Sequence, residues 1–175
     1  MANEKISLSG QELSFSEISH YYITSEKSLR SIYQKEIINS IDYTIREILN
    51  NELEQYIEEL DKSTALTMLA AIEAHFIVDF LQRCYYKDKK PISREFQKIF
   101  KRRKKNSKVY LEDILEIWKQ YTKKTVISDL IGAFKYRNWL AHGRYWVYKA
   151  GHKYDVYSLF TLSIDVQNEL GIEIW

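Results

Sequence analysis

The stretch 64-TALTMLAAIEAHFIVDFLQRC-84 decides the fold class. It contains no glycine or proline, and its apolar residues recur at intervals of three and four, which places them on one face of an α-helix. One charged residue, Glu73, interrupts this apolar stripe, whose other members are Leu66, Leu69, Ala70, Phe76, Ile77, Phe80 and Cys84. The stretch therefore predicts a core helix with a carboxylate where a leucine is expected.

The rest of the chain also favours long helices. No glycine lies between Gly10 and Gly132, and Pro91 is the only proline. Periodic apolar residues predict a helix from about Ser25 to about Leu60, bent near Asn50 and Asn51, where helix propensity drops. We expect a separate turn or helix at 15–22, and a second long helix starting at 61 or 63 and ending before 86.

Further helices are expected towards the C-terminus. Pro91 opens a basic amphipathic helix, and a turn around 106–107 leads to the segment 110–121. A helix over 124–141 should end at Gly143, a natural stop. Residues 144–156 are typical of a loop or short hairpin, and 157–170 predicts a closing helix, although its β-branched and aromatic residues leave a strand open.

These elements predict a single all-α domain spanning residues 1–175, an up-and-down bundle of about five helices, with 1–24 as a loosely packed N-terminal segment. Apolar residues make up 45% and charged residues 29%, which excludes a disordered chain. No uninterrupted apolar run is long enough to span a membrane, and no secretory signal is evident. The single cysteine, Cys84, suits a reducing compartment, so we expect a cytoplasmic protein.

The net charge of +2 does not identify a partner, but basic residues are concentrated locally. The segment 98-KIFKRRKKNSK-108 carries seven Lys or Arg residues and no acid. Such a run is either a solvated turn between helices or a surface that attracts phosphates.

A second apolar stripe is also interrupted by a charge. On the helix over 124–141 the stripe passes through Ile127, Leu130, Ile131 and Phe134, and then meets Arg137 before Ala141. Burying either Glu73 or Arg137 alone is costly, so each needs a partner or a water-filled cleft. We expect the two side chains to face each other across the bundle as a charge-assisted pair. A purely structural ion pair remains the alternative.

Two histidines also need an interpretation. His142 shares a helix face with Asn138 but lies about 140° around the helix from Arg137. By spacing alone it is a histidine at a helix C-terminus, where it interacts favourably with the helix dipole. His75 and Asp79 are four residues apart, but no third ligand has suitable spacing, which favours a surface pair over a metal site.

The segment 137-RNWLAH-142 resembles the motif of HEPN domains (higher eukaryotes and prokaryotes nucleotide-binding). The motif of that family is an arginine and a histidine separated by four to six residues, the first of which is polar. Here the spacer has four residues and the polar residue is Asn138. The resemblance in helical architecture covers about 25–170, but the motif is its specific part.

The resemblance implies metal-independent RNA cleavage, without a cofactor, in a homodimer whose two motifs line one cleft. In this interpretation Arg137 binds the phosphate and stabilises the transition state, His142 is the general acid and base, and Asn138 orients one of them or contacts RNA. Glu73 would orient Arg137. Such ribonucleases serve as toxins in toxin–antitoxin or phage-defence systems, which implies a neutralising antitoxin protein.

Several neighbouring residues are secondary candidates. Tyr145 and Trp146 could stack on bases, while Arg144 and the basic residues Lys101, Arg102 and Arg103 could contact RNA phosphates, for example of tRNA or mRNA. Some HEPN toxins carry a modifiable tyrosine two places after the histidine, whereas Tyr145 lies three places after His142. The alternatives to a ribonuclease are a non-catalytic module that binds RNA, nucleotide or protein, and a plain structural helical module.

Overall fold

The computed structural model describes residues 13–103, 110–149, 151 and 154–171. These residues contain no strand, and their helices are α1 (Phe15–Asn39), α2 (Tyr43–Tyr85), α3 (Pro91–Arg103), α4 (Leu111–Trp118), α5 (Lys124–Ala141) and α6 (Val156–Leu170). The prediction of an all-α protein is confirmed. Six helices are present in the described part of the chain, where about five were expected.

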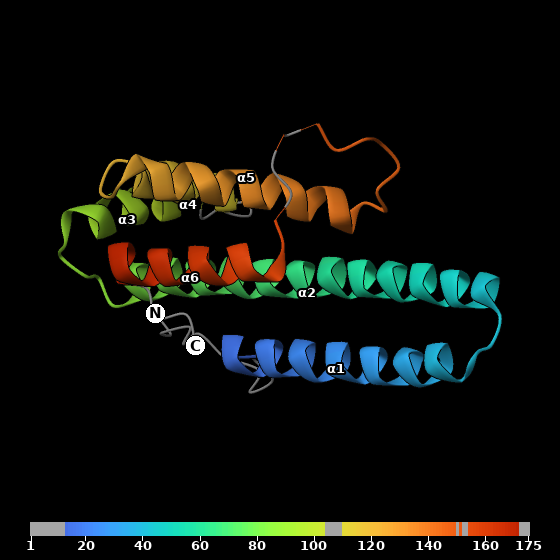
Figure 1. Ribbon diagram of the computed structural model, residues 1–175. Helices are drawn as coiled ribbons and strands as arrows, with labels where there is room; N and C mark the ends of the chain where they lie inside the picture. The colour runs from blue at the N-terminus through green and yellow to red at the C-terminus, as the bar shows by residue number, and fades with distance from the viewer. Residues whose placement is uncertain (1–12, 104–109, 150, 152–153, 172–175) are drawn as a thin grey trace.

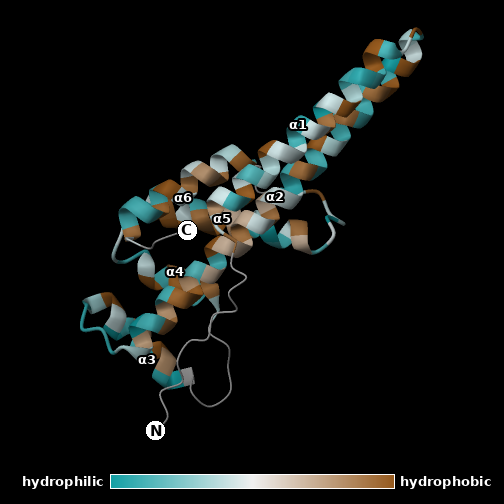
Figure 2. Ribbon diagram, turned by 90° about the horizontal axis from the view of Figure 1, so that it is seen from below, coloured by the Kyte–Doolittle hydropathy of each residue, from teal (hydrophilic) through white to brown (hydrophobic). Residues whose placement is uncertain are grey.

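The long helix α2 is the central element of the structure. Each of the other five described helices packs against it. As Figure 1 shows, α3, α4, α5 and α6 gather along the C-terminal half of α2, while α1 runs alongside its N-terminal half. The outer parts of α1 and α2 project together from the body as a two-helix arm (Figure 2).

Two predicted helix boundaries were wrong. Residues 15–22 do not form a separate element, because Ser14 and Glu17 form a capping box that starts one continuous helix through to Asn39. The break between the first two helices lies at 40–42, where the Asp42 side chain accepts a hydrogen bond from the Thr44 backbone amide and caps α2. A strong N-cap therefore determines this boundary.

The helix predicted to start at 61 or 63 is not a separate helix either. Residues 50 and 51 lie inside the continuous helix α2. The Asn50 side chain donates a hydrogen bond to the Arg46 carbonyl in the preceding turn. Ser63 likewise donates to the Leu60 carbonyl, so its hydroxyl bonds within α2. Local propensity for a break is overridden because α1 packs along this whole segment.

The later helices agree more closely with the sequence. The predicted helix over 124–141 has those bounds, and α3 begins at Pro91 as expected. The last segment is the helix α6, capped by Asp155 and ended by Gly171 in the left-handed conformation, so the alternative of a strand is excluded. The residues described within 144–156 contain no strand, and the turn expected at 106–107 lies outside the described residues.

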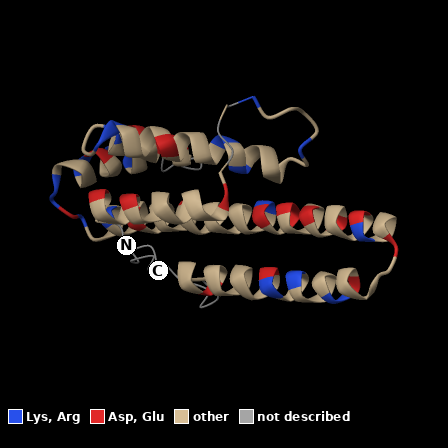
Figure 3. Cartoon of the chain, in the orientation of Figure 1, with Lys and Arg blue, Asp and Glu red and all other residues tan. Residues whose placement is uncertain are grey.

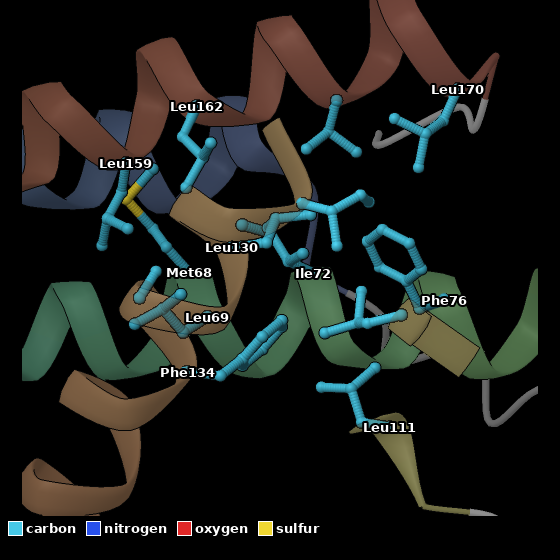
Figure 4. Close-up of a cluster of buried hydrophobic side chains, with 14 of the residues drawn as sticks. Met68, Leu69, Ile72, Phe76, Leu111, Leu130, Phe134, Leu159, Leu162 and Leu170 are labelled. Atoms are coloured by element: carbon cyan, nitrogen blue, oxygen red, sulfur yellow. The ribbon is translucent and has the colours of Figure 1, made fainter. Parts of the chain in front are cut away.

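The core forms where α2 meets α4, α5 and α6 (Figure 4). Met68, Leu69, Ile72 and Phe76 of α2 are fully buried there. The N-terminal turns of α1 are also packed, because Phe15, Ile18 and Tyr22 belong to the same cluster. By contrast, the tip of the arm exposes large apolar side chains, namely Ile38, Ile41, Tyr43, Ile45 and Ile48.

One described helix, α2, contains an 18-residue window with a mean hydropathy of 1.5, long and apolar enough to cross a membrane by length and composition alone. The sequence has no uninterrupted apolar run of this length, so we expected no membrane-spanning segment. The helix α2 passes only because the hydropathy is averaged over 18 residues. It is weak evidence for a membrane span, since core helices of soluble proteins meet the same criterion, and 39% of the window is buried inside the protein.

Truncating the core should destabilise the whole bundle. Phe76→Ala removes a fully buried ring, and we expect it to lower the free energy of unfolding by about 3–5 kcal/mol. Gln82→Ala on the exposed side of the same helix is the control and should cost less than about 0.5 kcal/mol. Urea unfolding followed by circular dichroism measures both, and equal effects would contradict the assigned core.

A second prediction concerns Asp61, a half-buried carboxylate of α2. Burial raises its pKa, and so does repulsion from Asp155, Glu26 and Glu58, while a hydrogen bond from the Tyr22 hydroxyl acts in the opposite direction. Ionised Asp61 therefore destabilises the folded state above its folded pKa, and this penalty disappears as the pH falls through that value.

Replacing the charge while keeping an acceptor for Tyr22 should stabilise the protein. We expect Asp61→Asn to raise the melting temperature at pH 7, and the gain to shrink as the pH is lowered. Thermal unfolding across a pH series measures this dependence. The exposed Asp165 of α6 provides a control, Asp165→Asn, which should show no comparable gain. A gain for Asp61→Asn that grows on acidification would contradict the assigned cause.

Candidate active site at the end of α5

An ion pair joins α2 to the last turns of α5. The Arg137 Nη2 atom lies 2.8 Å from the Glu73 Oε2 atom. The two residues that interrupt the apolar stripes do therefore face each other, as the sequence indicated. The pair is not buried, however, because the side chains are 31% and 32% exposed. Although both residues take core positions in the sequence pattern, the pair is not part of the buried core.

The pair is exposed because it lies where the core ends. On α2 the fully buried position is Ile72, next to Glu73, whereas Ala70 of the predicted stripe is exposed. On α5, Phe134 is buried one turn before Arg137, but Ala141 one turn after it is exposed. Arg137 is thus the last residue of its stripe to contact another helix, and solvent reaches its guanidinium.

Arg137 retains hydrogen-bonding capacity on this surface. Its Nη1 atom donates to the Asn138 Oδ1 atom at 3.2 Å, and its Nη2 atom is held by Glu73. The Nε atom has no hydrogen-bond acceptor among the described residues. A guanidinium has five N–H donors; because the Nε atom is buried and two donors are used, one N–H on each Nη atom remains for an additional anion.

His142 lies at the C-terminal cap of α5 and is exposed. Its backbone amide donates to the Asn138 carbonyl. Gly143 follows with φ of +77°. The Arg144 backbone amide donates a hydrogen bond to the Trp139 carbonyl, and this bond ends the helix in a Schellman motif. His142 and Asn138 thus share one accessible face, while no hydrogen bond joins the His142 and Arg137 side chains in the described structure.

Arg144 is anchored to α2 and has the positive φ of 59°, which is uncommon for a residue with a side chain. Its guanidinium makes two hydrogen bonds to the Glu59 carboxylate, of 2.6 and 2.8 Å. This contact lowers the pKa of Glu59 and raises that of Arg144. The pair connects the start of the loop after α5 to α2. The role of Arg144 as an RNA contact stays a prediction.

The loop after α5 forms an open pocket with the end of that helix, with a volume of about 700 Å³. Its lining consists of Lys135, Asn138, Trp139, Trp146, Val147, Tyr148 and Lys149. The Trp139 indole N–H donates to the Trp146 carbonyl at 2.6 Å, which ties the loop to the helix. Trp146 was a candidate from the sequence, whereas Trp139, Tyr148 and the two lysines were missed because no local pattern marks them.

Tyr145 lies beside this pocket and is 91% exposed. It is accessible to a modifying enzyme, although its ring does not line the pocket.

The basic residues of α3 lie elsewhere. Figure 1 places α3 at the far end of α5 from the motif, and Figure 3 marks basic residues in that region. Lys101 and Arg102 are exposed, and the Arg103 side chain is outside the described residues. Lys101 and Arg102 therefore lie away from the motif within one chain, and residues 104–108 of the basic run are outside the described residues.

Two other candidates behave as ordinary helix residues. Asp79 pairs with Arg83 at 2.7 Å, and the His75 Nδ1 atom lies 2.7 Å from the Ala71 carbonyl oxygen. No cluster of three potential metal ligands occurs among the residues that the structure describes. Cys84 is buried, and burial raises the pKa of its thiol to about 12, which leaves it unreactive at neutral pH.

Comparisons with known proteins identify no relative: no family model, no curated protein and no solved structure matches this chain.

The ion pair should matter more for activity than for stability. Glu73→Gln removes the charge but keeps an oxygen that can accept a hydrogen bond from Arg137. Since the pair is about one-third exposed, we expect the free energy of unfolding to fall by less than about 1 kcal/mol. RNA cleavage should fall at least about ten-fold if Glu73 orients Arg137. Full activity of this variant, measured together with urea unfolding, would contradict an orienting role.

Proposed function

We propose that this protein is a metal-independent endoribonuclease of the HEPN type. The observation that carries the proposal is the state of Arg137, which contacts both Glu73 and Asn138 and whose side chain is still 31% exposed. His142, the second residue of the motif, is exposed one helical turn after Asn138. The motif residues therefore lie on an accessible surface where a phosphodiester can approach them.

These side chains suit cleavage by the ribose 2′-hydroxyl. The hydroxyl attacks the adjacent phosphorus, losing its proton to a base, while the 5′ oxygen leaves and takes a proton from an acid. This forms a 2′,3′-cyclic phosphate and a free 5′-hydroxyl. Histidine can accept or donate a proton near neutral pH, and an arginine fork stabilises the charge on the non-bridging oxygens.

A second copy of the chain completes this proposed site. One protomer offers one His142, whereas the reaction uses an acid and a base at the same time. A two-fold dimer would bring two copies of the motif to one cleft. Such an enzyme would act on tRNA or mRNA in a toxin–antitoxin or phage-defence system, in the cytoplasm, and would require an antitoxin protein to neutralise it.

A non-catalytic RNA-binding module is the second candidate. The pocket between Trp139 and Trp146 favours it, because aromatic side chains beside exposed lysines bind nucleotides without any chemistry. The two candidates share their ligand and differ in whether His142 transfers protons.

RNA cleavage in the presence of a chelator tests the proposal. Purified wild type should cut total RNA or tRNA in excess EDTA and leave 2′,3′-cyclic phosphate ends. Arg137→Ala and His142→Ala should each lower the rate by at least about 100-fold, since each removes a group that acts in the transition state. Gel analysis of end-labelled RNA measures both the rate and the ends.

Lys124→Ala is the control, because Lys124 is exposed at the other end of α5 and should leave the rate unchanged. Equal activity in wild type, Arg137→Ala and His142→Ala would refute the catalytic assignment, as would cleavage that appears only after a divalent metal is added. If RNA is bound but never cut, the non-catalytic module is the correct reading.

A further inference from the structure

We propose that the pocket between α5 and the following loop binds one nucleotide of a single-stranded RNA, with its base against Trp146 and Trp139 and its phosphate between Lys135 and Lys149. The single-stranded RNA as ligand rests on the proposed function, but binding in this pocket does not require cleavage.

The wall of the pocket is a packed aromatic cluster. Trp139 stacks on Tyr136 with ring centroids 5.7 Å apart and an interplanar angle of 24°. Tyr148 packs against both rings, at 5.4 Å from Trp139 and 5.2 Å from Tyr136. Since Tyr136 is buried in the core, the cluster is fixed to the body of the bundle. A preformed aromatic surface of this kind stacks on a base at little entropic cost.

The mouth of the pocket is accessible. Trp146 is 55% exposed, which leaves much of its indole free for a further stacking partner. The volume of about 700 Å³ falls within the range of small-molecule sites, about 300–1,000 Å³, and suits a nucleotide.

The charge around the pocket selects an anion. Two of the lining residues, Lys135 and Lys149, are cationic, and none of the lining residues is acidic. Both lysines are exposed, and neither forms a salt bridge with any residue that the structure describes. Lysine is a compact cation that binds phosphate. An aromatic wall flanked by two cations therefore matches a base with its attached phosphate.

The pocket is coupled directly to the motif. Asn138 lines the pocket and also accepts a hydrogen bond from Arg137. A nucleotide seated on the aromatic wall therefore contacts the residue that also holds Arg137. The loop that closes the pocket is braced by the hydrogen bond between Trp139 and Trp146 and by the Arg144–Glu59 pair, so its shape is set before any ligand arrives.

A single strand fits better than a duplex. Bases in a duplex are stacked and paired, so their faces are not available to an aromatic side chain, whereas an unpaired base can be splayed onto one. The projecting part of α2 carries the exposed acidic residues Glu47, Glu52 and Glu54, none of which forms a salt bridge with any residue that the structure describes. These carboxylates would repel the extended backbone of a long duplex lying along the arm, where Figure 3 shows several acidic positions.

A binding assay that excludes cleavage tests this inference. The probe is a fluorescein-labelled single-stranded RNA of about ten nucleotides with 2′-O-methyl groups, which has no hydroxyl for attack. Fluorescence anisotropy should show that Trp146→Ala weakens binding about ten-fold, as expected for the loss of one stacked base. The double variant Lys135→Glu, Lys149→Glu should weaken binding at least as much and reduce its salt dependence.

Matched controls separate the pocket from general surface effects. Tyr43→Ala removes an aromatic ring that is 78% exposed at the tip of the arm, and Lys124→Glu reverses an exposed charge at the far end of α5. Both should bind like wild type. Trp146→Ala should fold normally because Trp139 bonds to the backbone carbonyl of residue 146, and circular dichroism checks this.

The outcomes are distinct. Wild-type affinity in the pocket variants would overturn the inference. A blunt-ended RNA duplex of the same sequence should bind more weakly than the single strand, and equal affinity for the two would also overturn it. Uridine or adenosine monophosphate that competed as strongly as the oligonucleotide would show a mononucleotide site instead and overturn the single-strand assignment. Because the probe cannot be cleaved, a wild type that binds it but does not cut unmodified RNA contradicts only the proposed function, whereas pocket variants that bind it like wild type contradict only this inference.

Discussion

The structure depends on α2 remaining a single helix. Its 43 residues give a rod of about 64 Å at 1.5 Å per residue, and every other described helix packs on it. The same rod carries both carboxylates that hold the site. Glu59 and Glu73 are separated by four turns of helix, which places them on about the same side. They hold Arg144 and Arg137, so one continuous helix fixes the orientation of the end of α5 and of the loop after it.

How far the sequence predicted the fold depended on the kind of signal. Elements bounded by strong signals were predicted well: Pro91 begins α3, and Gly143 follows the end of α5. Errors arose in the first 85 residues, where weak propensity at 50–51 suggested a bend and 61 and 63 suggested a cap. There, α1 packs along α2 and stabilises the helical state of residues that locally would allow a break. The capping box at Ser14 was readable from the sequence but was overlooked.

The candidate site was also predictable only in part, because some of its contacts depend on tertiary packing. Two charges on apolar stripes had to be neutralised, and this constraint gave the Glu73–Arg137 pair from spacing alone. The degree of burial was not predictable, since it depends on where α5 leaves the core. Arg144 and Glu59 lie 85 residues apart in the chain, and the aromatic rings of the pocket come from both a helix and a loop. Such contacts depend on the tertiary arrangement, which periodicity does not encode.

The partial exposure of the ion pair supports the chemical role that we propose for Arg137. A fully buried pair would need every donor of Arg137 to be satisfied inside the protein, and no group would remain to meet a substrate. At the edge of the core the carboxylate holds one side of the guanidinium, the Nε atom is buried, and the side chain as a whole stays 31% exposed. The surrounding core restrains the side chain, so less rotational freedom is lost when an anion binds. An arginine held in this way suits the phosphate contact that we propose, and Asn138 connects it to the aromatic pocket.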